Sequence, residues 1–209
     1  MYVLHHWPDS ASLIIRLVLD ELGLPHERHL IDRKGGALDS AAYRALHPLG
    51  LIPALETPDG PMFETAAILL YLCDRHPGLA PPPDSPQRAE FLKWLFFTSS
   101  NIQPTMLQLY YPDRTAGPDC APAVLSHARA RLTVLLKVLE AANPAVLSAT
   151  RPTALGYYLA VLLRWIARDI PSQTYPNLHA MLQFLENRPA ALALARAENL
   201  GVTIFSDPD

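Results

Sequence analysis

The segment 81–86 (PPPDSP) contains four prolines and constrains the fold more than any other feature of the chain. Polyproline is stiff and extended, and a proline cannot continue a helix because it lacks the backbone N–H. At about 150 residues per domain, the 209 residues suffice for one large domain or two small ones. The sequence therefore predicts two domains, residues 1–80 and 87–209, joined by a proline-rich linker at 81–86.

Before the linker, strand-like and helix-like hydrophobic patterns alternate, separated by glycine and proline. Strands are expected at 2–6, 26–31, 54–57 and 61–63, and helices at 10–22, 38–46 and 64–73. The last two strands read as a hairpin around Pro58-Asp59-Gly60. The order βαβαββα is typical of an α/β sandwich.

After the linker, every segment has a helical pattern: 86–110, 122–142, 153–168, 176–187 and 190–196. Pro122, Pro152, Pro176 and Pro189 stand where helices would start, a position at which a missing N–H costs nothing. The second domain is therefore predicted to be an all-α helical bundle.

Composition excludes several other classes of protein. Half of the residues are hydrophobic and 18% are charged, which excludes a disordered chain, and a net charge of −3 argues against a nucleic-acid-binding surface. The longest uncharged stretch, 94–112, is interrupted by polar residues, so no membrane span is expected. No basic and apolar leader follows Met1, so we expect a cytoplasmic chain. Cys73 and Cys120 are far apart, which excludes structural zinc, a dithiol motif and a disulfide framework.

The segment 47–56 (HPLGLIPALE) carries a proline at the start of the third strand. If the Ile52–Pro53 bond is cis, the backbone N–H and C=O of Ile52 face outward and can pair with an extended peptide. An ordinary turn proline is the alternative interpretation.

The segment 63–72 (FETAAILLYL) places Glu64 and Thr65 at the start of a helix. Glu64 can pair with an ammonium group there. Thr65 offers its hydroxyl and its backbone N–H to a carboxylate, because a helix N-terminus has unpaired donors and a favourable dipole. One short motif can thus hold both charges of an amino-acid group. The alternative is a plain N-terminal cap with an acidic first turn.

Together with a third segment, 175–190 (YPNLHAMLQFLENRPA), these two segments resemble the cytosolic glutathione transferases. They are similar to that family's N-P-x-G-x-V-P-x-L, E-S-x-A-I-x-x-Y-L and Y-P-x-L…R-P-A patterns, with Thr65 in place of serine. The resemblance covers nearly the whole chain, although between 87 and 150 it is only helical. It implies a thioredoxin-like N-terminal domain, an all-α C-terminal domain and a cytoplasmic homodimer.

The resemblance also implies a function. Glutathione would be the co-substrate, and its thiolate would be conjugated to a small, apolar electrophile in detoxification, with no metal and no nucleic-acid or membrane partner. Two alternatives remain: a non-catalytic binding or interaction protein, and a glutathione-dependent isomerase, peroxidase or dehalogenase. The implied glutathione contacts are Ile52, Pro53, Glu64 and Thr65, with Arg33, Lys34 and His47 as candidates for its glycine carboxylate.

Enzymes of this family place a Tyr, Ser or Cys after the first strand, where this chain reads HHWPDSASL over 5–13. Ser10 and Ser12 both fit as the hydroxyl that activates the thiol, while a cysteine-type alignment falls on Ala11. The alternative role for the serines is helix capping, with Asp9 or Ser10 as the N-cap.

Other residues receive weaker interpretations. Asn101, Tyr110 and Tyr111 lie on an uncharged, partly aromatic helix that could line a second-substrate pocket or a dimer interface. Cys73 is expected to be a packed thiol. The histidines at 5, 6, 26 and 29 are too scattered for a metal site.

Gly156 departs from the family pattern, which has aspartate three residues after the capping Ser or Thr. Thr153 can still cap its helix alone, but half of the reciprocal capping box is missing. On local grounds, Gly156→Asp should therefore stabilise the fold by about 0.5–2 kcal/mol.

Overall fold

The computed structural model describes residues 1–208, with the backbone alone at Asp169. Its N-terminal part has the predicted element order and is a thioredoxin-like domain. The elements are β1 (Tyr2–His6), α1 (Ser12–Glu21), β2 (His26–Leu30), the 3₁₀ turn η1 (Ala37–Asp39), α2 (Ala41–Leu46), β3 (Ala54–Thr57), β4 (Gly60–Met62) and α3 (Thr65–Arg75). The helix expected at 38–46 is divided at Ser40, whose hydroxyl caps α2 by accepting the Tyr43 N–H at 3.1 Å.

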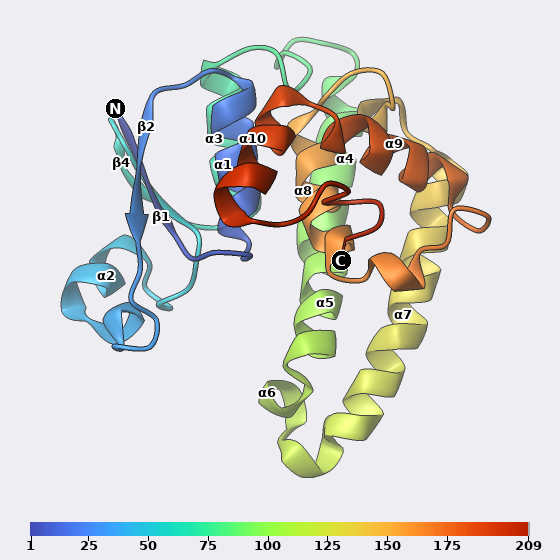
Figure 1. Cartoon of the computed structure of the whole chain (residues 1–209), viewed down its shortest axis with the longest axis horizontal. Coiled ribbons are helices and arrows are strands. Elements are labelled where there is room, and N and C mark those ends of the chain that lie inside the picture. The colour runs from blue at the N-terminus through green and yellow to red at the C-terminus, as the bar shows by residue number, and fades with distance from the viewer. Residues whose placement is uncertain (209) are drawn as a thin grey trace.

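The four strands form one mixed sheet in the order β2-β1-β3-β4. β1 runs parallel to β2 and antiparallel to β3, and β3 is antiparallel to β4. α1 and α3 share a core with one face of the sheet, where Leu4 and Leu55 are fully buried. On the opposite face, α2 packs Tyr43 against Ala54 and Ile31 in a small separate cluster. The sheet therefore has α1 and α3 on one face and the α2 cluster on the other, and Figure 1 shows α1 and α3 along one side of it.

The C-terminal part is helical, as predicted. Its helices are α4 (Arg88–Phe97), α5 (Gln103–Tyr110), α6 (Pro112–Ala116), α7 (Ala121–Ala142), α8 (Ala154–Arg164), α9 (Pro176–Glu186) and α10 (Pro189–Glu198), with a π-helical segment η2 (Thr98–Ile102) and the short 3₁₀ turns η3 (Pro118–Cys120), η4 (Ala145–Leu147) and η5 (Ala167–Asp169). No helix in this described part of the chain is long and apolar enough to cross a membrane.

The observed helices differ from the predicted ones in three details. The single helix expected at 86–110 is interrupted by η2, where the Gln103 N–H donates to the Thr98 carbonyl five residues earlier. Pro104 follows directly and has no backbone N–H to continue the regular helical bonds. Pro152 does not begin α8, because Thr153 is the N-cap and the proline precedes it. The short helix α6 was not predicted.

α8 joins the two parts of the molecule. Every residue from Ala154 to Leu163 is buried, and α8 contacts α1 as well as α4 and α9. α1 also contacts α10, so helices from both ends of the sequence lie side by side (Figure 1). One continuous hydrophobic core therefore spans both parts. The exact boundaries 1–80, 81–86 and 87–209 stay a prediction.

Candidate functional site

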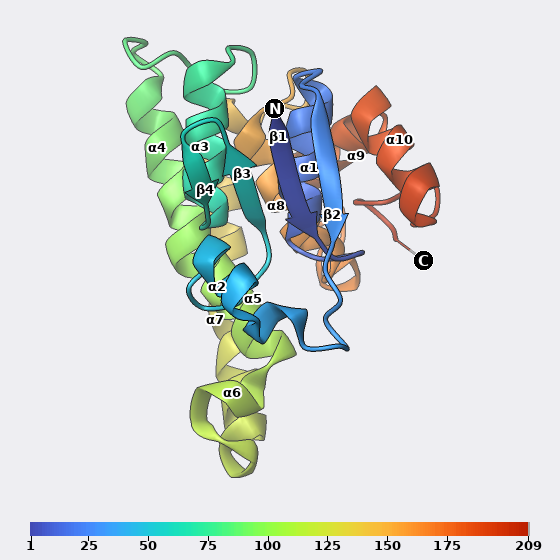
Figure 2. The same ribbon diagram turned by 90° about the vertical axis from the view of Figure 1, so that its left-hand side faces the viewer.

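The segments that the sequence singled out meet at one end of the sheet, where β1, β2 and β4 end and β3 begins. His5 on β1 pairs with Ala54 on β3, so the end of β1 lies beside the start of β3. Leu55 pairs with Met62, which brings the end of β4 to the same end of the sheet. β2 runs parallel to β1 and ends there too. The Ser10, Ile52, Glu64 and Lys34 segments therefore all leave the sheet on one side, the end of the sheet near α2 in Figure 2.

Ile52 and Pro53 stand directly before β3. The Ile52–Pro53 peptide bond is cis, as predicted. Pro53 is buried and Ile52 is partly exposed. Within residues 1–208, no group bonds to the backbone N–H or C=O of Ile52. These two groups are therefore available to an extended peptide.

Glu64 and Thr65 form the start of α3. Glu64 is exposed, has the left-handed backbone angle φ of +69°, and accepts no side-chain hydrogen bond from the described residues. Thr65 is only 4% exposed, yet its hydroxyl has no partner in the described chain. Strained backbone of this kind costs about 1–3 kcal/mol and concentrates at functional sites. The carboxylate and the hydroxyl are both left open to a ligand.

His47 lies beside this helix start. Its ring is 5.0 Å from that of Phe63, centroid to centroid, and its Nδ1 accepts the Leu49 N–H at 3.3 Å. Because Nδ1 is an acceptor, Nε2 carries the proton of the neutral ring. Burial lowers the pKa of His47, an effect that the nearby charge of Glu64 partly opposes. His47 is therefore a neutral donor at neutral pH.

The two basic candidates on the loop after β2 are placed differently. The Arg33 guanidinium lies 5.7 Å from the centroid of the Trp7 ring, which brings it beside the loop that carries Ser10. Lys34 is exposed and contacts no described side chain. Of these two, only Arg33 has an observed link to the rest of the site.

Ser10 and Ser12 form a hydroxyl pair around one carbonyl group. Ser10 Oγ donates to the Trp7 C=O at 2.7 Å and lies 2.8 Å from Ser12 Oγ. Ser12 Oγ lies 3.1 Å from the same carbonyl and accepts the Trp7 N–H at 3.4 Å. Ser12 is only 1% exposed, whereas Ser10 is partly exposed. Of the two hydroxyl residues, Ser10 is therefore the one that a ligand can reach, and Ser12 is buried.

Helix capping does not account for these polar residues. α1 begins at Ser12 with Ala11 as its N-cap, and no side chain caps it in the usual geometry. Ser10 Oγ accepts the Ser12 N–H only at 3.3 Å. Asp9, the other possible cap, instead accepts hydrogen bonds from Arg164, the last residue of α8, and from Trp165, which follows it.

The proposed second-substrate residues do not gather in one place. Asn101 accepts a hydrogen bond from Arg131 on α7 at 3.0 Å. The Tyr111 ring lies under the Arg114 guanidinium at 4.0 Å. Tyr110, which is 48% exposed, donates its hydroxyl to the Trp165 carbonyl. Because Trp165 contacts Asp9, Tyr110 alone of the three is linked to the Ser10 loop.

Sequence reasoning missed Trp7 and Trp165 at this site. The Trp7 carbonyl organises both serines, but a backbone acceptor leaves no residue-type signal. Trp165 lies 155 or more positions from the loop it contacts, so no local spacing could have linked them. Only the positive backbone angle at Asp9, φ +44°, marks the loop as unusual, and it is visible in the structure alone.

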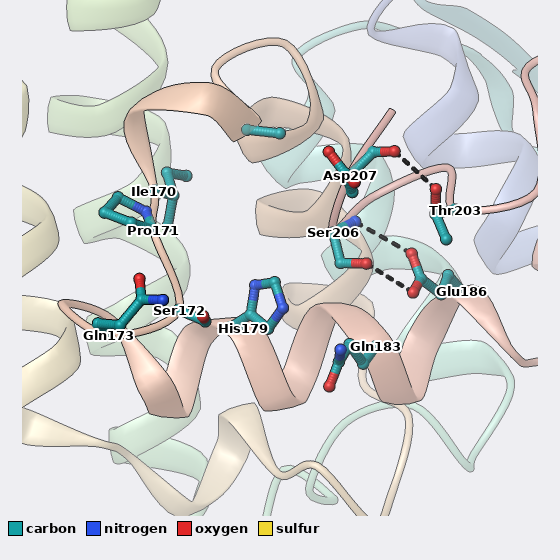
Figure 3. A pocket seen from close by; sticks show the side chains of 11 residues that line it. Ile170, Pro171, Ser172, Gln173, His179, Gln183, Glu186, Thr203, Ser206 and Asp207 are labelled. Atoms are coloured by element: carbon teal, nitrogen blue, oxygen red, sulfur yellow. Dashed lines mark hydrogen bonds between the residues drawn. The ribbon is translucent and has the colours of Figure 1, made fainter. Parts of the chain in front are cut away.

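A separate hollow of about 430 Å³ lies between the α8–α9 connection, α9 and the C-terminal segment (Figure 3). Glu186 spans its wall by accepting the N–H groups of Phe205 and Ser206 at 3.2 and 3.0 Å. None of the described lining residues belongs to the predicted site. Glu186 thus holds the C-terminal segment, and Ser10 does not line the hollow.

The remaining side chains of interest have structural roles. Cys73 is buried, and burial raises the pKa of its thiol to about 12, so it is a packed thiol as predicted. No group of three His, Cys, Asp or Glu side chains among the described residues is placed to hold a metal ion.

Comparison with known proteins identifies close relatives of this arrangement. Residues 10–75 match the family model "Glutathione S-transferase, N-terminal domain". Glutathione S-transferase GST-4.5 of Xanthomonas campestris pv. campestris is 30% identical over 164 residues, which cover 76% of this chain and 79% of that protein.

Solved structures agree with this match. A glutathione S-transferase from Xylella fastidiosa has a TM-score of 0.82 at 26% identity, over 96% of this chain and 100% of that chain. The glutathione transferase URE2P8 from Phanerochaete chrysosporium, solved with oxidized glutathione, has a TM-score of 0.83 over 95% of each chain. At 20% identity, the second likeness shows the fold alone.

Proposed function

Because the chain belongs to the glutathione S-transferase family, we propose that it conjugates the thiolate of glutathione to a small, apolar electrophile. The observation that supports this most directly is the set of groups at Ile52, Glu64 and Thr65 that have no partner in the described chain. They lie at the same end of the sheet as the Ser10 hydroxyl. These three groups match a peptide backbone, an ammonium and a carboxylate, and the Thr65 hydroxyl is the unusual one, because polar groups on a nearly buried residue are normally paired.

Each open group has a partner on glutathione. The Ile52 backbone pairs with the cysteinyl backbone, as a strand edge would. Glu64 pairs with the γ-glutamyl ammonium, and the Thr65 hydroxyl and N–H bind the adjacent carboxylate at the start of α3. His47, Arg33 and Lys34 are the candidates that bind the glycine carboxylate. With the peptide bound in this way, its cysteine thiol points toward the Ser10 loop.

Ser10 supplies the proton that stabilises the thiolate. In the free protein it donates to the Trp7 carbonyl, but Ser12 lies 3.1 Å from the same oxygen and can replace it there. The Ser10 proton is then free to point at the sulfur. In this proposal Ser10 donates to the sulfur, and Ser12 takes over the bond to the Trp7 carbonyl.

One such bond is sufficient in energy. A thiol with a pKa of about 8.5 is about 3% ionised at pH 7, and lowering that pKa to about 6.5 requires about 2.7 kcal/mol. A hydrogen bond to a charged acceptor contributes about 1.5–3 kcal/mol, and a helix N-terminus about 0.3–1 kcal/mol. Holding the thiolate beside its acceptor adds proximity without further chemistry.

The second substrate, the assembly and the location extend the same proposal. Tyr110 and Trp165, packed edge to face, offer an apolar wall next to the Ser10 loop. Phe96 on α4 is 53% exposed, a large apolar side chain that a homodimer interface would cover. A cytoplasmic role in detoxification fits a soluble conjugating enzyme.

The test is retention on immobilised glutathione followed by a conjugation assay with an aryl halide. We expect retention, elution by free glutathione and measurable turnover. Retention without turnover for a panel of electrophiles would favour a non-catalytic binding protein. Absence of retention would contradict the assignment of Ile52, Glu64 and Thr65 as the binding groups.

A further inference from the structure

Asp9 connects the Ser10 loop to the far end of the sequence. Its carboxylate accepts hydrogen bonds from Trp165 Nε1 at 3.0 Å and from Arg164 Nε and Nη2 at 3.2 and 3.4 Å. Its backbone N–H donates to Glu198 Oε2 at 3.1 Å. We call Asp9, Arg164, Trp165 and Glu198 the Asp9 cluster. It joins the residue before Ser10 to the end of α8 and to α10.

The partners of Asp9 are themselves fixed. Glu198 accepts a hydrogen bond from Arg16 of α1 at 2.7 Å, and both side chains are less than one tenth exposed. Arg164, 10% exposed, also donates to the Ile204 carbonyl at 3.0 Å. Buried or half-buried side chains therefore hold both the exposed carboxylate and the backbone N–H of Asp9, so the cluster is not a solvated surface ion pair.

The backbone at Asp9 explains why the anchors matter. Its φ of +44° is uncommon for a residue other than glycine, although aspartate tolerates it better than most residues. The hydrogen bonds on both sides of the residue hold this conformation. The next residue is Ser10, whose hydroxyl donates to the Trp7 carbonyl two residues before Asp9.

We propose that Asp9 is a positioning residue, which holds the Ser10 hydroxyl in place through the Asp9 cluster and so makes thiol activation depend on the C-terminal helices. This inference rests on the proposed function. The thiol-activating loop is set from outside its own domain, by α8 and α10. Trp165 also accepts the Tyr110 hydroxyl, so one residue contacts both the loop and the apolar wall.

The test compares Asp9→Gly, Asp9→Asn and Ser10→Ala in the full chain. Glycine adopts φ +44° without strain, so Asp9→Gly removes the carboxylate and its bonds to Arg164 and Trp165 but keeps the turn and the backbone N–H that bonds to Glu198. Asparagine keeps both the turn and an acceptor for Trp165. Thiol ionisation is read from the ultraviolet absorbance of bound thiolate against pH, and glutathione affinity from calorimetry.

For Asp9→Gly we expect the pKa of the bound thiol to rise by about one pH unit, and activity at pH 6.5 to fall about tenfold and to recover at higher pH. The glutathione Kd should stay within about threefold, because the peptide is held elsewhere. Asp9→Asn should restore most of the activity. Trp165→Phe, which keeps the ring and loses the Nε1 donor, should shift the pKa in the same direction by less.

The sign of the change separates positioning from a direct charge effect. Loss of a negative charge near the sulfur would favour the thiolate and lower its pKa, whereas loss of positioning raises it. A lowered or unchanged pKa in Asp9→Gly, with a raised one in Ser10→Ala, would overturn the role of Asp9 and leave the proposed function standing. If Ser10→Ala also leaves the pKa unchanged, the assigned roles of both Asp9 and Ser10 fail, whereas the proposed function itself is contradicted by the absence of retention and turnover. Asp119→Ala, an exposed carboxylate before α7, is the matched control, and a lower Tm without a pKa change would mean a structural role only.

Discussion

The two ends of the candidate site hold their polar groups in opposite ways. At the peptide end, Ile52, Glu64 and Thr65 leave donors and acceptors without partners in the described chain. At the thiol end, Ser10 and Ser12 are engaged by the Trp7 carbonyl and by each other. An open group binds a ligand by exchanging bonds with water and gives up no bond within the protein. A closed pair must exchange one bond for another, so its performance depends on how firmly the loop is held.

This difference predicts that changes at the peptide end alter affinity, and that changes at the thiol end alter ionisation. The largest expected effect is at Glu64. Glu64→Ala should weaken glutathione binding by about 5- to 150-fold, the equivalent of about 1–3 kcal/mol for a charged hydrogen bond. Calorimetry measures it. Glu27→Ala, another exposed carboxylate on the sheet, serves as the control, and an unchanged affinity in Glu64→Ala would remove its role.

Ser10→Ala should produce the complementary profile. The glutathione Kd should stay within a few-fold, while the pKa of the bound thiol rises by about one to two units. The rate at pH 6.5 should then fall about 10- to 100-fold and return at higher pH. Stopped-flow conjugation across pH measures this.

Ser12→Ala tests the order of the two serines. Without Ser12, the Trp7 carbonyl keeps the Ser10 proton, so we expect a thiol pKa between those of the wild type and Ser10→Ala. A larger shift in Ser12→Ala than in Ser10→Ala would reverse the assigned order. No shift in either would assign thiolate stabilisation to backbone N–H groups.

A pair of variants at Gly156 tests a site where the helical part departs from the family pattern. Thr153 caps α8 alone, accepting the Gly156 N–H at 2.9 Å. A Cβ at Gly156 would lie 3.2 Å from Leu185 Cδ1 and 3.2 Å from Thr153 Oγ1, so crowding opposes the gain expected from the local sequence. Both Gly156→Ala and Gly156→Asp share this crowding, and only Asp offers an acceptor to the Thr153 N–H. We expect Asp to be more stable than Ala by about 0.5–2 kcal/mol in thermal unfolding; equal stability would exclude a restored cap.

The smallest expected effect is on stability against pH, with one histidine near each end of the site. Burial lowers the pKa of both His6 and His47 in the folded chain, while each titrates near about 6.5 when unfolded. Below that pH the unfolded chain binds protons that the folded chain does not, so the free energy of unfolding should fall as the pH falls. Urea titrations from pH 7.5 to about 5 measure the slope. His6→Gln and His47→Gln should each flatten it, and a slope that neither variant changes would have another origin.

The sequence by itself determined the strand and helix order, the start of α3 and the proline before β3. These features depend on residues that are close in the chain: hydrophobic period, breakers and a short motif at a helix start. For the same reason Glu64, Thr65 and Ile52 could be named in advance. The interruption at η2 was missed, although Pro104, which lacks the backbone N–H of a continuous helix, stands directly after it.

Only the tertiary structure distinguishes Ser10 from Ser12. Both are small hydroxyl residues at the same helix start, and their difference is burial, which α1 acquires by packing against α8 and α10. The anchors of the loop, Arg164 and Trp165, are more than 150 positions away from Asp9. Contacts at that separation carry no local pattern, because folding and not spacing brings the residues together.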